Sequence, residues 1–210
     1  MAYVLGFIYA DGSIYPSVRG RYLSITSIDK DIIFKIKKWL SSEHKITIAK
    51  PTWKNGKDRY VLRIGNKNLY SDLQKHGLYP NKSLTIRLPK ISIRFFKDFL
   101  RGYFDGDGCV NLYLTKGKTQ PLIIRKLSVI FTSGSKLFLN DLLRQIKRRL
   151  DLKQSKVYNS HRSFQLRFAT RDSMKLFEFM YKNTNKELFL SRKYKIFQKY
   201  LKLKNGVVAK

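Results

Sequence analysis

Two aspartates stand at corresponding places in a repeated stretch of the sequence. Asp11 precedes the last residue of the segment Val4–Gly12, and Asp107 precedes the last residue of the similar segment Leu100–Gly108. If the fold brought both carboxylates together, they would offer the hard oxygen ligands that Mg²⁺ or Ca²⁺ prefers. A cation held in this way activates water for attack on a phosphodiester and stabilises the leaving oxygen.

Each aspartate follows a pair of small residues that are four positions apart. This spacing puts both small residues on one face of a helix and lets a second helix backbone approach closely. We therefore expect two helices packed side by side, with both carboxylates at their C-terminal ends. A helix C-terminus disfavours negative charge, and a bound cation would offset that cost in both copies. The small residues are Gly6 and Ala10 in the first copy and Gly102 and Gly106 in the second.

An EF-hand is the alternative for the stretch that begins at Asp105. The twelfth position of such a loop would be Lys116, where a bidentate glutamate is required. The sequence therefore excludes an EF-hand here.

The similarity continues beyond the aspartates in the same order. Thr26-Ser27 recurs as Thr132-Ser133, Leu62-Arg63 as Leu166-Arg167, and Asn81-Lys82 as Asn185-Lys186. The second copy carries a turn-rich insertion around residues 115–121. A duplication of this length predicts two subdomains, 1–91 and 92–210, packed as one body.

Within each copy, the hydrophobic pattern predicts helix, two strands, helix, two strands, helix. The fold class is therefore α+β, with pseudo-symmetric αββαββα subdomains. In the first copy we expect Ser27 to cap the second helix and Gly77 to close the third. In the second copy we expect one last helix that carries Leu188, Phe189, Ile196, Phe197, Tyr200 and Leu201. The expected strands are 13–17, 21–26, 46–53, 59–64, 110–114, 127–132, 157–160 and 164–169.

Composition restricts the partner. The chain has 210 residues, 44 Lys plus Arg against 14 Asp plus Glu, a net charge of +30, and 43% hydrophobic residues. A folded protein with this excess needs a polyanion, first nucleic acid and second an acidic membrane surface. No apolar stretch approaches the roughly 20 residues that span a bilayer. Cys109 is the single cysteine, which excludes internal disulfides and favours a reducing intracellular compartment, either a bacterial or phage-infected cytoplasm or an organelle matrix.

With these motifs in view, the chain resembles the LAGLIDADG homing endonucleases in their monomeric, two-motif form. The segment Gly77–Ser83 also looks like the family. The resemblance implies that Asp11 and Asp107 are metal-binding catalytic acids and that the carbonyls of Ala10 and Gly106 help to hold Mg²⁺. It implies that Ca²⁺ binds without necessarily supporting cleavage. It also implies basic residues near the scissile phosphates, for which Lys82 and Lys186 are our candidates. Tyr9 replaces the acid that usually precedes the catalytic aspartate by two positions.

The resemblance further implies intron homing, with both strands cut across the minor groove to leave 3′ overhangs. Two antiparallel sheets would form a DNA-binding saddle beside the motif helices. Alternation along the strands puts polar side chains on the outer faces, where a β-ribbon can contact the major groove. Since the copies differ here, we expect a long asymmetric target. The candidate contacts are Tyr15, Arg19, Arg21, Arg59, Arg63, Asn111, Tyr113, Lys116, Gln165 and Arg167.

Two other functions stay open at this point. One is an RNA maturase that binds its own intron, and the other is a DNA-binding repressor that has lost cleavage. The presence of both Asp11 and Asp107 argues against the repressor.

Overall fold

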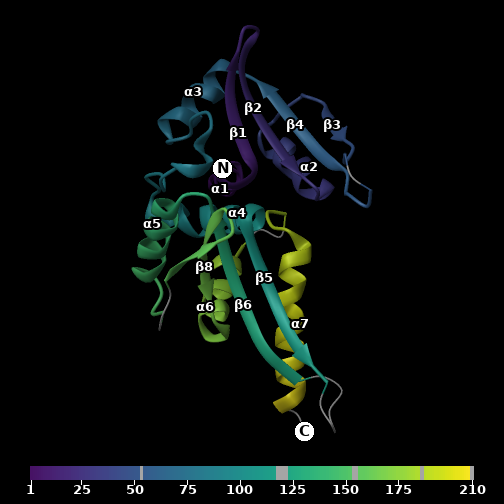
Figure 1. Ribbon diagram of the computed structural model, residues 1–210, viewed down its shortest axis with the longest axis vertical. Helices are drawn as coiled ribbons and strands as arrows, with labels where there is room; N and C mark the ends of the chain where they lie inside the picture. The colour runs from purple at the N-terminus through teal and green to yellow at the C-terminus, as the bar shows by residue number, and fades with distance from the viewer. Residues whose placement is uncertain (53, 117–122, 153–155, 185–186, 209–210) are drawn as a thin grey trace.

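The computed structural model describes residues 1–52, 54–116, 123–152, 156–184 and 187–208. Its chain builds two similar halves, stacked along the longest axis (Figure 1). The first half contains α1 (Ala2–Asp11), β1 (Gly12–Ser17), β2 (Gly20–Ser27), α2 (Lys30–Trp39), β3 (Ile46–Ala49), β4 (Arg59–Gly65) and α3 (Lys67–Lys75). The short helices η1 (Lys82–Leu84) and η2 (Ile93–Phe95) lead to the second half. That half contains α4 (Phe96–Asp107), β5 (Gly108–Thr115), β6 (Ile123–Ser133), α5 (Lys136–Lys147), β7 (Val157–Ser160), β8 (Ser163–Phe168), α6 (Thr170–Tyr181) and α7 (Ser191–Val208). The predicted α+β duplication is confirmed.

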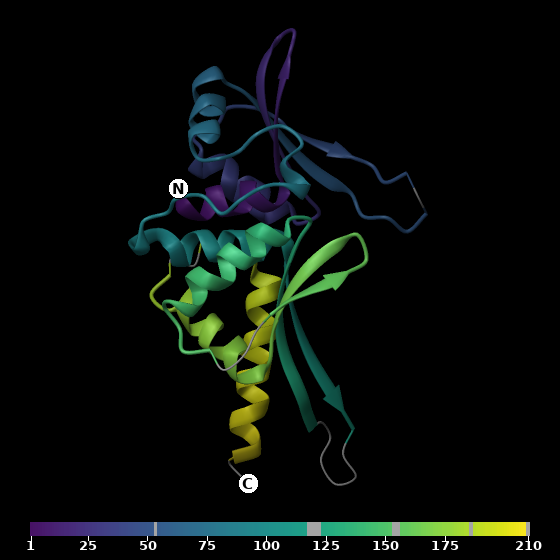
Figure 2. The same cartoon turned by 60° about the vertical axis from the view of Figure 1, so that its left-hand side comes forward.

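Each half contains one four-stranded antiparallel sheet with the same strand order. The orders are β1-β2-β4-β3 and β5-β6-β8-β7. The long hairpins pair Tyr15 with Tyr22 in the first sheet and Tyr113 with Lys126 in the second. Both sheets lie on one side of the helices, so their outer faces together form a curved, saddle-shaped surface (Figure 2).

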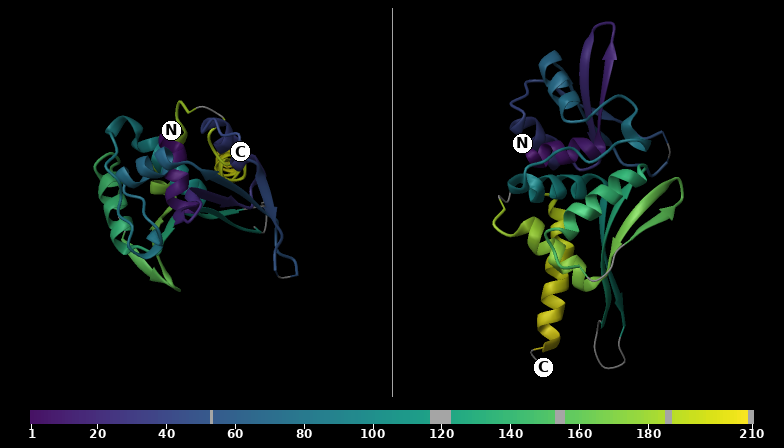
Figure 3. Two further views of the ribbon diagram at one scale, coloured as in Figure 1. Left: turned by 90° about the horizontal axis from the view of Figure 1, so that it is seen from above. Right: turned by 90° about the vertical axis from the view of Figure 1, so that its left-hand side faces the viewer.

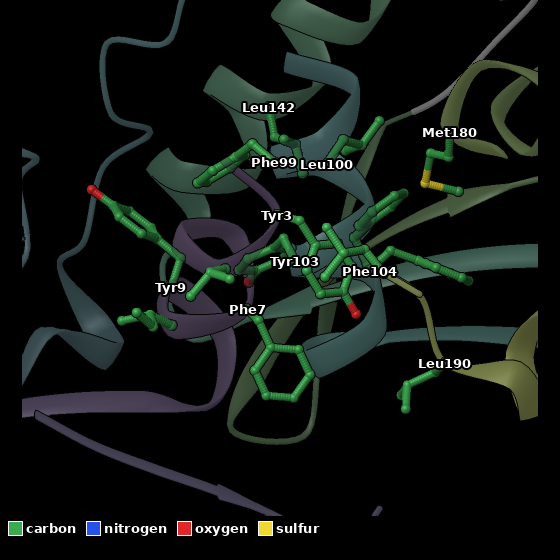
Figure 4. Close-up of a cluster of buried hydrophobic side chains, with 14 of the residues drawn as sticks. Tyr3, Phe7, Tyr9, Phe99, Leu100, Tyr103, Phe104, Leu142, Met180 and Leu190 are labelled. Atoms are coloured by element: carbon green, nitrogen blue, oxygen red, sulfur yellow. The ribbon is translucent and has the colours of Figure 1, made fainter. Parts of the chain in front are cut away.

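The motif helices α1 and α4 lie side by side across the middle of the molecule (Figure 3). A Cβ added to Gly102 would lie 2.0 Å from the Tyr3 carbonyl oxygen, and one added to Gly6 would lie 2.1 Å from the Phe99 carbonyl oxygen. Only glycine therefore allows these backbones to touch. Large buried aromatic rings, among them Phe7, surround the contact (Figure 4). The predicted packing of the two motif helices is confirmed.

The second half ends differently from the prediction. The expected single last helix is wrong, because α6 and α7 are separate and Leu188 and Phe189 precede α7. The carbonyl of Leu188 accepts a hydrogen bond from Arg101 Nε, and the amide of Leu190 donates one to Asp105. Since buried side chains use these backbone groups, the segment cannot continue the helical hydrogen-bond pattern.

The first half shows two smaller differences. The strand expected over 46–53 ends at Ala49, and residue 53 lies outside the described residues. The cap of α2 is Asp29, whereas Ser27 accepts a hydrogen bond from the Asp29 amide. As predicted, Gly77 closes α3, with a φ of 85° and a hydrogen bond from the Leu78 amide to the Leu73 carbonyl.

Two further expectations from the sequence concern the subdomain boundary and membrane-spanning helices. The boundary between residues 91 and 92 falls in the connection between the halves and stays a prediction. Within the described ranges, no helix is both long and apolar enough to cross a bilayer.

We expect Gly102→Ala to destabilise the protein by about 3 kcal/mol, because its methyl group must push two helix backbones apart. The melting temperature should fall by roughly 6–12 °C for a chain of this size. Gly65→Ala is the control, since its Cβ would meet only the edge of the Tyr22 ring, at 3.1 Å. Equal melting of Gly102→Ala and the parent would contradict the close contact.

Candidate functional site

The two aspartates are the last residues of the motif helices. Gly12 and Gly108 follow them, and their amides donate to the carbonyls of Ile8 and Phe104. A Cβ on Gly12 would lie 2.6 Å from the Ile8 oxygen, and one on Gly108 would lie 2.4 Å from the Phe104 oxygen. Glycine therefore lets the chain pass directly from helix to strand after each aspartate.

The ends of α1 and α4 are in contact beside the carboxylates. A Cβ added to Gly106 would lie 2.3 Å from Ala10 Cβ and 3.3 Å from an Asp11 carboxylate oxygen. The charge of Asp107 in turn raises the pKa of Asp11. The seam thus places both carboxylates near each other, where the two sheets begin.

Burial and mutual repulsion strain these carboxylates. Burial, followed by the charge of Asp107, raises the pKa of Asp11 to about 7, although Lys193 and Lys82 oppose the shift. Burial also raises the pKa of Asp107, against the same two lysines. Both carboxylates are therefore held in a place that favours their neutral form, and a divalent cation would reverse that preference.

The donor set suits a hard cation. Across the described ranges, no group of three or more His, Cys, Asp or Glu side chains is close enough to hold a metal ion. The site therefore offers the carboxylates of Asp11 and Asp107, and carbonyl ligands from Ala10 and Gly106 stay a prediction. Mg²⁺ commonly binds through one or two carboxylates and keeps several waters, so these residues fit it.

Lys82 lies at the end of α1. Its side chain is buried, and its Nζ donates to the carbonyl oxygen of Tyr9 at 2.9 Å. Burial lowers the pKa of Lys82, while the charges of Asp107 and Asp11 raise it. This places an ammonium group beside the predicted metal ligands. Lys186, the other predicted lysine, lies outside the described residues.

Sequence reasoning missed Lys193 in the first turn of α7. Its Nζ donates to the carbonyls of Phe104, Asp105 at 2.8 Å and Gly108 at 2.6 Å, and it lies 3.5 Å from that of Gly106. Burial lowers its pKa to about 8. Lys193 thus contacts the end of α4 as Lys82 contacts the end of α1. The match of Asn81-Lys82 with Asn185-Lys186 pointed to an earlier residue, because the segment before α7 shifts the spacing.

The position two residues before each motif aspartate differs between the halves. One carboxylate oxygen of buried Asp105 accepts from the Tyr3 hydroxyl at 2.8 Å and from the Leu190 amide at 2.8 Å. The other oxygen has no partner within the described part of the chain. Burial raises the pKa of Asp105 to about 6. In the first half, the Tyr9 hydroxyl donates to the His76 carbonyl. Each side chain ties its helix to a neighbouring segment, by different chemistry.

Most candidate DNA contacts share the outer face of the saddle. In the first sheet, Arg63 pairs with Ser24 and Arg59 with Ala49, away from buried Leu62. In the second, Arg167 and Gln165 lie on the face opposite buried Leu166 and Phe168, and Arg167 Nε donates to Gln165 Oε1 at 2.8 Å. The outer-face candidates are Tyr15, Arg59, Arg63, Asn111, Tyr113, Gln165 and Arg167.

Three candidates lie elsewhere. Arg21 pairs with Pro16 and shares the strand face of Leu23, so it does not join the outer-face set, although it is exposed near the end of the hairpin. Arg19 lies in the turn between β1 and β2, and Lys116 follows β5; both are exposed. The structure thus brings the seven outer-face residues together and leaves these three at the margins.

Comparisons with known proteins agree with this geometry. A model of the LAGLIDADG-like domain matches residues 1–77 and 96–180, which covers both repeats. The chain belongs to the LAGLIDADG family, in its two-motif, single-chain form.

Individual relatives are more distant. An uncharacterized protein of Methanocaldococcus jannaschii is 30% identical over 124 residues, which span 56% of this chain and only 40% of that protein. The structure of I-AabMI bound to uncleaved DNA has a TM-score of 0.64 at 14% identity, over 99% of this chain and 91% of that one. A point variant of I-DmoI with target DNA and Mn has a TM-score of 0.58 at 21% identity, over 89% and 96%. I-DmoI with DNA and Ca has a TM-score of 0.55 at 22% identity, over 85% and 87%. These structures show that the fold is shared.

We expect Asp11→Asn to stabilise the metal-free protein by about 1–3 kcal/mol at pH 8, because the neutral amide avoids the cost of a desolvated carboxylate. The sign follows from the pKa of about 7. The folded state disfavours the ionised form, so the parent loses this part of its stability between about pH 4 and pH 7. Thermal melts at pH 4.5 and pH 8 in EDTA measure it.

Added Ca²⁺ should then raise the melting temperature of the parent more than that of Asp11→Asn. A variant that melts below the parent at pH 8 in EDTA would contradict the strain on this carboxylate.

Proposed function

We propose that this protein is a metal-dependent, site-specific double-strand DNA endonuclease. The observation that carries the proposal is the pair of desolvated carboxylates, Asp11 and Asp107, held at the contact of two helices where two sheets with basic side chains begin. Family membership and the solved relatives bound to DNA with Mn or Ca support it.

Asp11 and Asp107 would hold the cation, together with the carbonyls of Ala10 and Gly106. A bound divalent cation supplies an activated water and neutralises charge on the phosphodiester in the transition state; we propose Mg²⁺. Lys82 holds its ammonium beside both aspartates, where it can counter charge on the scissile phosphate. Lys193 keeps the end of α4 in place through its carbonyl contacts. A role for Lys186 stays a proposal.

The outer faces of the sheets would bind the duplex. Their arginine and amide side chains suit base edges in the major groove, and the remaining positive charge suits phosphates. Because the two faces carry different residues, the target should be long and asymmetric. Cleavage across the minor groove with 3′ overhangs, in a monomer, is part of the proposal. No described contact favours the maturase. A repressor that only binds DNA would not require two desolvated carboxylates at the helix contact.

We expect Asp11→Asn and Asp107→Asn each to abolish double-strand cutting while DNA binding persists, because each removes one ligand charge and leaves the sheets intact. Cleavage of a randomised duplex library with Mg²⁺ identifies the target, and binding is then measured by gel shift in Ca²⁺. Asp72→Asn is the matched control, since Asp72 is exposed on α3 and pairs with Lys75. Cutting by both variants at the parental rate would refute the site.

Binding should depend strongly on salt. With about ten phosphate contacts, the log–log slope of affinity against salt concentration should be about −9. Fluorescence anisotropy with the selected duplex between 50 and 300 mM KCl measures the slope. A slope near zero would contradict a DNA-binding saddle.

A further inference from the structure

An ion pair joins the two halves beside Asp11. Arg192 in the first turn of α7 donates from Nε and Nη2 to both carboxylate oxygens of Asp29, over 2.8–3.0 Å. The two residues are far apart in sequence and belong to different halves. Asp29 is about one-fifth exposed and Arg192 about half exposed. This is a bidentate contact of the kind that fixes the orientation of a guanidinium group.

The Asp29 carboxylate does not make the hydrogen bonds expected of a residue at the start of a helix. As the N-cap of α2, it would normally accept hydrogen bonds from the first amides of the helix. In the described structure its side chain makes no such cap bond, and both oxygens contact Arg192 instead. The carboxylate therefore pairs with the Arg192 guanidinium and does not cap the helix.

The corresponding position in the other half has different chemistry. Ser135 is the N-cap of α5, and its hydroxyl accepts from the Phe138 amide and donates to the Ile86 carbonyl. That contact is buried and neutral. The arrangement of a charged guanidinium on an N-cap carboxylate thus occurs at Asp29 and not at Ser135.

The ion pair borders a pocket that contains the candidate catalytic acid. The pocket has a volume of about 400 Å³, and its lining includes Asp11, Asp29, Arg59, Gly106 and Arg192. Arg59 belongs to the outer face of the first sheet, so the pocket lies between the carboxylate site and the basic saddle. A phosphate group that approaches Asp11 from this side would meet the guanidinium.

The way Asp29 holds Arg192 leaves one edge of the guanidinium available. Asp29 contacts Nε and Nη2, and no bond to Nη1 occurs within the described ranges. A guanidinium has five N–H donors in a fixed plane, so it can bind a second oxyanion without releasing the first.

We propose that Arg192 binds a backbone phosphate of the strand that enters the pocket beside Asp11, and that Asp29 is its positioning residue. This rests on the proposed function. Because the other half has a neutral contact at the matching place, the two strands should be cut with unequal dependence on this pair. The ligand is a phosphodiester of duplex DNA.

Strand-specific cleavage tests the proposal. With the selected duplex labelled on either strand, Arg192→Lys and Asp29→Asn should slow one strand at least tenfold more than the other, so that nicked DNA accumulates. Asp29→Glu should restore part of the rate, because it keeps the charge. Glu187→Gln is the matched control: Glu187 forms another ion pair between the halves, 3.9 Å from Lys38, and lies outside this pocket. It should leave both strands unchanged.

A binding measurement separates this proposal from the proposed function. In Ca²⁺, Arg192→Gln should reduce the magnitude of the salt slope by about 1, whereas Glu187→Gln should not change it. An unchanged slope, or equal slowing of both strands, would show that the pair only joins the halves and would overturn the proposal. A parent that binds duplex but cuts neither strand would refute the nuclease, while the slope would still decide the role of Arg192.

Discussion

The direct contact of two helix backbones is the constraint on which the rest of the structure depends. Gly6 and Gly102 let α1 and α4 approach so closely that no side chain separates them. The contact continues to Ala10 and Gly106, so the last turns of the two helices also touch. A side chain at either glycine would force the helices apart. The two carboxylates and the sheets that follow them would then also move apart.

The helix contact places two carboxylates where ionisation is unfavourable, and two nearby lysines offset part of that free-energy cost. Asp11 and Asp107 are desolvated and repel each other, yet Lys82 and Lys193 lie close enough to lower the pKa of both. The lysines make their hydrogen bonds to main-chain carbonyls at the helix ends, which is where cations stabilise a helix. The site therefore combines two carboxylates and two ammonium groups at the contact of α1 and α4.

The sequence predicted the local parts of this arrangement well. The repeat around Asp11 and Asp107, the small residues before them and the alternation in the strands are all read from short spacings, and the helices and sheets follow them. Lys193 was missed because its contact with α4 depends on where α7 begins, and a long-range contact leaves no periodic signal. The same reason hid the pairing of Arg192 with Asp29 and the bonds of Arg101 and Asp105 that keep residues 188–190 from being helical. Arg21 was a candidate contact because it lies on the first hairpin, and the pairing register puts it on the face opposite the outer-face set.

The burial of α1 has a consequence for how the protein is made. Most of its apolar side chains are buried, and α4 packs directly against its backbone at Gly6. During translation, α4 leaves the ribosome only after the whole first half, so α1 waits without its partner while that half is already complete. A chain interrupted before α4 holds only Asp11, on a helix whose α4-facing surface is uncovered. The pair of carboxylates therefore forms only once the second repeat has folded onto the first.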